Sequence, residues 1–151
     1  MSLSHRITIA AAVLFFFILP SLRADDSPFT PPAGDPLAIL ALPDGLVLSN
    51  ISVAVSKALV SQDWENLGWD GNITTATIKK SHVNIKVFVL AGVSEVKLFA
   101  QYSPENNMAE EKCHQIALRE LRSLEKIVAK KLSLSFHEAR GEETVDRATS
   151  G

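Results

Sequence analysis

The chain has 151 residues, of which 46% are hydrophobic and 21% charged, and its formal net charge is −2. This length predicts one folded domain, and the near-neutral charge argues against a nucleic-acid-binding protein, which would need a concentrated basic surface. The single cysteine, Cys113, excludes an internal disulfide. Its apolar helical surroundings predict a buried thiol, and the alternative is a disulfide between two chains.

Residues 1–24 have the features of a secretory signal peptide. His5 and Arg6 precede an apolar run that Pro20 ends, and Ala24 offers a cleavage site. The run is shorter than the roughly 20 residues of a spanning helix, so we expect no stable membrane span after cleavage. The alternative is that the segment is kept as an anchor. We therefore expect an exported protein, either periplasmic or secreted.

Residues 25–45 contain five of the seven prolines and predict an extended tether, because proline lacks a backbone donor and fixes φ. The folded domain is expected to span residues 46–136. Within it, helical spacing of apolar residues predicts a helix over residues 50–62. Residues 46–48 before it are either a short strand or a packed lead-in.

A turn-rich connection, residues 63–71, follows the predicted helix and carries both tryptophans. Trp64 and Trp69 are expected to seal the end of the core, because such large rings are costly to leave in water. The alternative is that one of them lines a site for a sugar or another flat ligand.

Alternating apolar residues predict three antiparallel strands over residues 72–102. A loop at Gly92-Val93 would place Val89 opposite Val96, and the apolar residues of both strands would then share one face. A loop at Lys80-Ser81 would likewise place Ile78 opposite Val83. The result is a three-stranded antiparallel meander.

The most regular helical pattern begins near Glu105 and continues to about Lys131. Asn107 and Glu110 have the spacing of a capping box, so the regular helix is expected to start there. Residues 132–136 predict an edge strand or a fraying helix end, and the polar residues 137–151 predict a disordered tail. The predicted fold class is α+β, in the order α-β-β-β-α, with two helices on one face of the sheet.

The sheet face away from the helices is unusually apolar for a solvated surface, which predicts a binding surface or an intramolecular cover. The cover would be the proline-rich stretch, residues 46–48 or residues 132–136. A partner would be a second copy stacking through this face, forming a homodimer, or an envelope protein. The candidate binding residues are Ile73, Lys86, Phe88, Leu90, Lys97 and Phe99.

A catalytic or metal site is the weaker interpretation. His114 and Glu110 are four residues apart on one helical face, and His82 is the third candidate metal ligand. Cys113 and His114 are adjacent on a helix and so point about 100° apart, which disfavours a shared pocket. The sequence contains no Gly-rich phosphate loop and no CxxC pair, so we expect no cofactor.

Several local patterns resemble a family of small exported bacterial proteins, many of them lipoproteins of unknown function. They are ALVSQDW ending at Trp64, the strand NITTATIKKSH, the strand VNIKVFV, a third strand ending at Tyr102, and a helix carrying Cys113-His114. The resemblance covers about residues 51–128. The chain departs from the family at Asp63, where glycine is usual, and has no cysteine for lipid attachment. The resemblance implies the α-β-β-β-α fold and export, and no established activity.

Two functional hypotheses follow from the sequence. The first is an exported, non-catalytic binding or assembly module of the bacterial envelope. The second is a small metal-dependent or Cys/His hydrolase. Because no recognisable catalytic spacing is present, we expect the first.

Overall fold

A computed structural model describes residues 27–149, so the predicted signal peptide lies outside the described residues. Seven elements follow one another along the chain. They are β1 (Ala38–Ala41), α1 (Leu48–Ser61), β2 (Glu65–Asp70), β3 (Ile73–Lys80), β4 (Val83–Ala91), β5 (Glu95–Pro104) and α2 (Glu110–Thr149).

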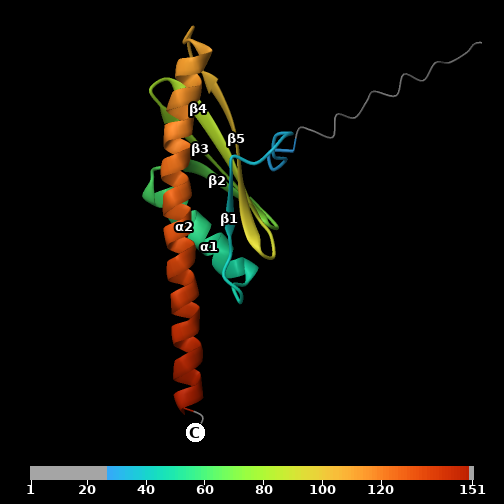
Figure 1. Cartoon of the computed structure of the whole chain (residues 1–151). Helices are drawn as coiled ribbons and strands as arrows, with labels where there is room; N and C mark the ends of the chain where they lie inside the picture. Colours follow the sequence, from blue (N-terminus) through green and yellow to red (C-terminus); the bar gives the residue numbers. More distant parts are fainter. Residues whose placement is uncertain (1–26, 150–151) are drawn as a thin grey trace, which may run out of the picture.

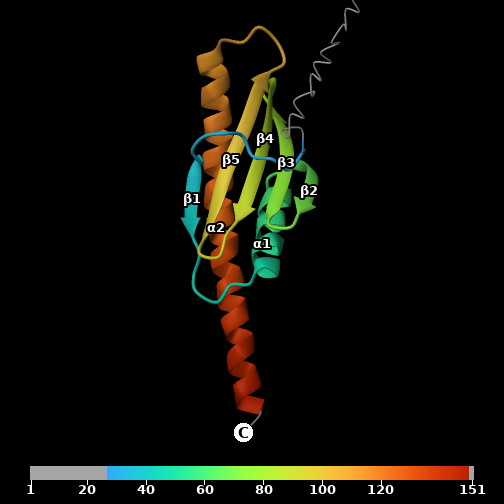
Figure 2. The same cartoon turned by 90° about the vertical axis from the view of Figure 1, so that its right-hand side faces the viewer.

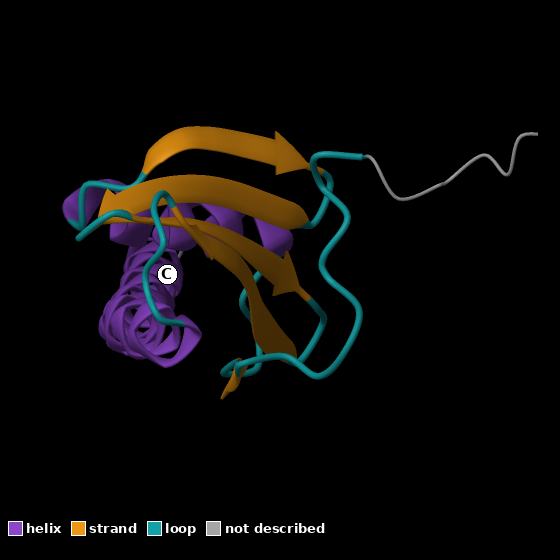
Figure 3. Ribbon diagram, turned by 90° about the horizontal axis from the view of Figure 1, so that it is seen from above, coloured by secondary structure: helices purple, strands orange, loops and turns teal. Residues whose placement is uncertain are grey.

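The strands form one antiparallel sheet in the order β1-β5-β4-β3-β2, and both helices lie on the same side of it (Figures 1 and 3). The α+β class and the placement of both helices are as predicted from the sequence. The three-stranded meander was too small, because β1 and β2 add a strand at each edge. We call the helix-covered side the inner face and the opposite side the outer face.

The chain visits the two edges of the sheet before it builds the centre. It forms β1 at one edge, crosses beneath the sheet as α1, and enters β2 at the opposite edge (Figure 2). Three successive hairpins then bring β5 back beside β1, and α2 packs against α1 and β5. Residues 25–45 are therefore not a tether throughout, since β1 lies within them. Pro36 and Pro43 flank β1 and confine it to four residues at an edge.

The predicted faces of the central strands are right, although both predicted registers were wrong by two residues. Val89 lies opposite Leu98 rather than Val96, and Ile78 lies opposite Ile85 rather than Val83. Side chains alternate with a period of two, so a shift of two residues leaves every side chain on its predicted face.

Both register errors came from the position of the turn. The β3–β4 turn is Ser81-His82, with φ angles of 49° and 65°, which is the left-handed pair that a two-residue hairpin turn requires. Neither residue is glycine, so their composition does not predict a turn at this position. In the other hairpin Gly92 pairs with Glu95, and the tip is Val93-Ser94.

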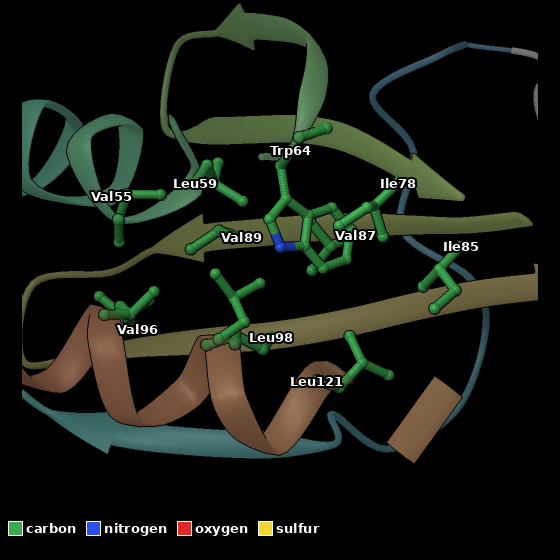
Figure 4. Close-up of a cluster of buried hydrophobic side chains, with 14 of the residues drawn as sticks. Val55, Leu59, Trp64, Ile78, Ile85, Val87, Val89, Val96, Leu98 and Leu121 are labelled. Carbon is green, nitrogen blue, oxygen red and sulfur yellow. The ribbon is translucent and has the colours of Figure 1, made fainter. Parts of the chain in front are cut away.

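The hydrophobic core fills the space between the inner face and the two helices (Figure 4). Trp64 is 4% exposed and packs among Leu59, Val87 and Val89, as the sequence predicted for a ring that seals the core. Trp69 is 61% exposed, so the same prediction was wrong for it. α1 ends where Asp63 adopts a left-handed φ of 60°, and the Trp64 N–H donates to the Leu59 carbonyl.

Helix α2 starts later and ends later than its apolar pattern predicts. It begins at Glu110, because β5 continues to Pro104 and the Glu105 N–H donates to the His82 carbonyl. It runs on to Thr149, so the predictions of an edge strand at 132–136 and a disordered tail were wrong. A helix that is already formed gains one hydrogen bond per added residue, so it extends through polar sequence without apolar periodicity. Its 40 residues span about 60 Å.

No helix within residues 27–149 combines the length and the apolarity needed to cross a bilayer.

The core predicts a large difference between two leucines of α2. Leu124 is fully buried and Leu134 is 46% exposed. Leu124→Ala should lower the free energy of unfolding by about 2–5 kcal/mol, because it leaves a cavity between α2 and the sheet. Leu134→Ala, the same change on the same helix, should stay within about 0.5 kcal/mol of the wild type. Urea denaturation followed by circular dichroism measures both, and equal losses would contradict this packing.

Candidate functional site

The outer face carries all six residues that the sequence analysis selected as a binding surface, in different rows from those expected. Ile73, Leu90 and Lys97 lie opposite one another across β3, β4 and β5, and Phe88 lies between Thr75 and Phe99 in the next row. Lys86 lies one row further on. The residues therefore share a face, as predicted, with the same two-residue shift as the rest of the sheet.

Phe88 is 1% exposed, so the centre of the outer face is covered. The cover is the described part of the proline-rich stretch, residues 27–36, which we call the strap. The strap runs over the sheet on the side away from α2 (Figures 1 and 2). Of the two explanations left open by the sequence, intramolecular cover therefore holds for this part of the face.

Two contacts hold the strap on the sheet. The Lys86 ammonium donates a hydrogen bond of 2.8 Å to the Pro28 carbonyl oxygen, and its Nζ lies 4.8 Å from the centre of the Phe88 ring. The Phe29 ring lies against Gly68 of β2, where an added Cβ would come within 3.0 Å of both the ring and the Thr75 hydroxyl. The missing side chain of Gly68 thus leaves a notch for an aromatic ring.

Beyond Lys86 the outer face is polar and uncovered. A hollow of about 510 Å³ opens there between β2 and β5. Its floor includes uncharged hydrogen-bonding side chains from four strands, and Asn66 donates to the Thr77 hydroxyl at 2.8 Å. The polar side chains around the hollow are Glu65, Asn66, Thr77, Lys79, Asn84, Lys86, Gln101 and Ser103. Such a surface offers donors and acceptors to a ligand and little net charge.

The predicted metal ligands do not come together. Nowhere in residues 27–149 do three or more His, Cys, Asp or Glu side chains form a group that could hold a metal ion. His114 forms a hydrogen bond with the Tyr102 hydroxyl, while His82 lies 3.7 Å from Glu105 in the β3–β4 turn. Cys113 is 2% exposed and His114 is exposed, so the adjacent pair faces opposite environments, as helix geometry predicts.

Glu105, which follows β5, contacts two residues at the β3–β4 turn, Lys79 and His82. Its carboxylate lies 2.6 Å from the Lys79 ammonium, and the hydrogen bond from Lys79 is the main reason that the pKa of Glu105 lies below its ordinary value. A carboxyl whose pKa is lowered by folding adds stability at neutral pH, and that contribution is lost as the pH falls through the lowered pKa. The pair is exposed to solvent, so its role is local and holds the turn against the end of β5.

Phe29 and Gly68 both build the covered face, and neither was predicted from the sequence as a site residue. Phe29 is the one aromatic residue in a proline-rich stretch that was interpreted as a free tether. An aromatic side chain between prolines could have indicated that this stretch packs on the domain, because burying an aromatic ring is favourable. Gly68 gave no signal, since its role depends on which residue lies opposite it in space.

Comparison with protein-family models, curated proteins and solved structures returned no match for this chain. The resemblance to small exported bacterial proteins therefore stays a prediction. The class that the fold defines is an α+β domain whose sheet is covered by helices on one face and partly by the strap on the other.

The strap predicts a specific effect of removing the Phe29 ring. Phe29→Ala should loosen the strap. Leu37 directly follows the strap, and its N–H donates to the Leu98 carbonyl. The Leu37 amide of the variant should therefore exchange with solvent about tenfold faster. Phe136→Ala is the matched control, because Phe136 is also partly buried and lies on α2. Amide exchange followed by NMR measures both. Equal exchange of Leu37 in the wild type and in Phe29→Ala would show that the ring does not hold the strap.

Proposed function

We propose that the protein is an exported, non-catalytic binding or assembly module and that the outer face of its sheet meets a polypeptide segment of a partner that carries an aromatic residue. The observation that carries this proposal is the strap itself. It is a proline-containing segment with a turn at Pro28-Phe29, bound to the face through one backbone carbonyl and one aromatic ring. A surface that holds such a segment of its own chain has the chemistry to hold another.

The uncovered hollow supports the same proposal. It continues the face beyond Lys86, and its amide and hydroxyl side chains suit the alternating donors and acceptors of a peptide backbone. Its two lysines are already engaged, Lys79 by Glu105 and Lys86 by the Pro28 carbonyl. A largely neutral lining favours an uncharged segment over a strongly charged one.

The arrangement of the partly exposed apolar residues also supports a binding role. Ile73, Leu90 and Lys97 form the row on the far side of Phe88 from the hollow, and none of the three is fully buried. The strap thus lies between a polar hollow and a partly apolar row. A longer segment that follows the strap's path would contact all three zones.

Export is the second part of the proposal, and the amino-terminal sequence supports it. In a Gram-negative host that makes the full chain, the periplasmic fraction should contain a protein lacking residues 1–24, because Ala24 ends the predicted cleavage site. Intact-mass spectrometry of each fraction measures this. A Phe16→Arg control, which places a charge in the apolar run, should retain the full mass in the cytoplasm. Full-length mass in every fraction of the unmodified chain would refute a cleaved signal.

Peptide binding is tested with a free copy of the strap. The protein is the full-length Phe29→Ala variant, whose own strap lacks the ring, and the probe is a synthetic peptide of residues 25–36. We expect the peptide to shift the NMR signals of the Gly68 and Thr75 amides, because its Phe would enter the notch. A peptide with Phe replaced by Ala should bind about tenfold more weakly.

The control for the notch is Gly68→Val in the same Phe29→Ala background. Its side chain occupies the space of the ring, so binding should be lost while the rest of the spectrum is kept. Folded protein that responds equally to both peptides, or to neither, would contradict an aromatic-dependent peptide site on this face.

A further inference from the structure

The two edges of the sheet differ in how well they could accept another strand. The β2 edge is irregular: its register with β3 shifts between Glu65 and Gly68, and Asn66 has a left-handed φ of 51°. It also begins and ends with the acidic residues Glu65 and Asp70. Irregularity and edge charges both hinder pairing with a further strand.

The β1 edge has none of these features over Ala38–Ala41, and its one irregularity comes before the strand, where the Leu37 N–H also donates to the Leu98 carbonyl opposite Ala38. Its sequence is Ala-Ile-Leu-Ala, it pairs with β5 in regular register, and it lies at the margin of the sheet (Figure 2). Within residues 27–149, no strand pairs with its outer side. A regular edge strand without charge or proline is a template for strand addition.

The backbone of β1 presents its unused groups around Ile39. The Leu42 N–H donates to the Ser94 carbonyl at 2.8 Å, and bonded positions alternate along an antiparallel ladder. Ala38 and Leu40 therefore direct their N–H and C=O groups toward β5. Ile39 and Ala41 direct theirs away from the sheet, where a further strand would lie.

The side chains of β1 on the outer face are also apolar and exposed. Ile39 is 56% exposed, and Ala41 is exposed on the same side. Large aliphatic side chains on an unpaired edge lose their contact with water when another strand adds there. Backbone and side chains thus favour pairing at the same place.

We propose that β1 pairs with β1 of a second copy of this chain, antiparallel and about a twofold axis through Ile39. Ile39 then lies opposite Ile39 of the other copy, and the outward N–H and C=O groups of each Ile39 pair with those of the other. This register is self-complementary, and it brings no like charges together because the strand has none. The pairing doubles the sheet, and it stops at two copies because the β2 edges are irregular. It uses a different surface from the strap-covered face, and so goes beyond the proposed function.

Sedimentation velocity of the full chain tests this pairing over a range of concentrations. The wild type should reach twice the monomer mass. Ile39→Lys should remain a monomer, because two lysines would then face each other at the axis, and it should fold because Ile39 is largely exposed. Leu67→Lys is the matched control. It places the same charge at a 40% exposed leucine on the opposite edge strand and should leave the dimer intact.

Cross-linking keeps the test independent of the stability of the lysine variant. Ile39→Cys should form a covalent dimer with a short bis-maleimide, since the axis brings the two thiols together, and Leu67→Cys should not. The native Cys113 is buried and serves as the background. A wild-type chain that stays monomeric, a dimer that survives Ile39→Lys, equal cross-linking through Leu67→Cys, or growth beyond two copies would each overturn the proposal.

Discussion

Strand β4 is the constraint on which the rest of the fold depends. It lies at the centre of the sheet, with β3 on one side and β5 on the other, and every second residue from Val83 to Ala91 is buried on the inner face. This alternation fixes which side of each neighbouring strand faces the helices, because paired residues project from the same face. It therefore also decides which residues form the outer face, including Phe88, which departs from the alternation of buried and exposed residues because the strap covers it. The strap is the consequence, because a central strand that carries a phenylalanine on its outer face needs a layer over that residue as well as the layer on its inner face.

The sequence was sufficient to predict what depends on periodicity. The class, both helices, the three central strands and the face of each candidate residue follow from spacings of two or of three to four residues.

What could not be predicted depends on residues that meet in space. Strand β2 could not be predicted because its composition, with Asn66 and Gly68, is typical of a turn. In the structure these residues lie in an irregular edge strand. The turn at Ser81-His82 was hidden because two ordinary residues adopt left-handed angles. The strap was hidden because a stretch with many prolines has no internal hydrogen-bonding pattern that would reveal where it packs. The predicted metal ligands failed for the same reason, since helical spacing placed Glu110 and His114 on one face and gave no information about His82.

The outer face divides the surface of the domain into parts with different chemistry. The strap covers the aromatic centre, amide and hydroxyl side chains line the hollow beyond it, and aliphatic residues lie toward β1. In a structure whose inner face is filled by two helices, these are the parts of the sheet that remain able to meet another molecule. The buried Cys113 and the His114–Tyr102 hydrogen bond belong by contrast to α2 and its packing on β5. Both contribute to the contact between α2 and the sheet.

The pairing of β1 with β5 has a consequence for how the chain folds. Ala38 lies opposite Leu98, so this contact joins residues that are far apart in the sequence, whereas each hairpin from β2 to β5 joins near neighbours. Contacts between distant residues bear a larger entropy of loop closure and form late. β1 is the first strand to be synthesised, yet it has no partner until β5, the last strand, has formed. Until then both β5 and the strap-binding face are exposed, and the nascent domain presents more apolar surface than the finished one.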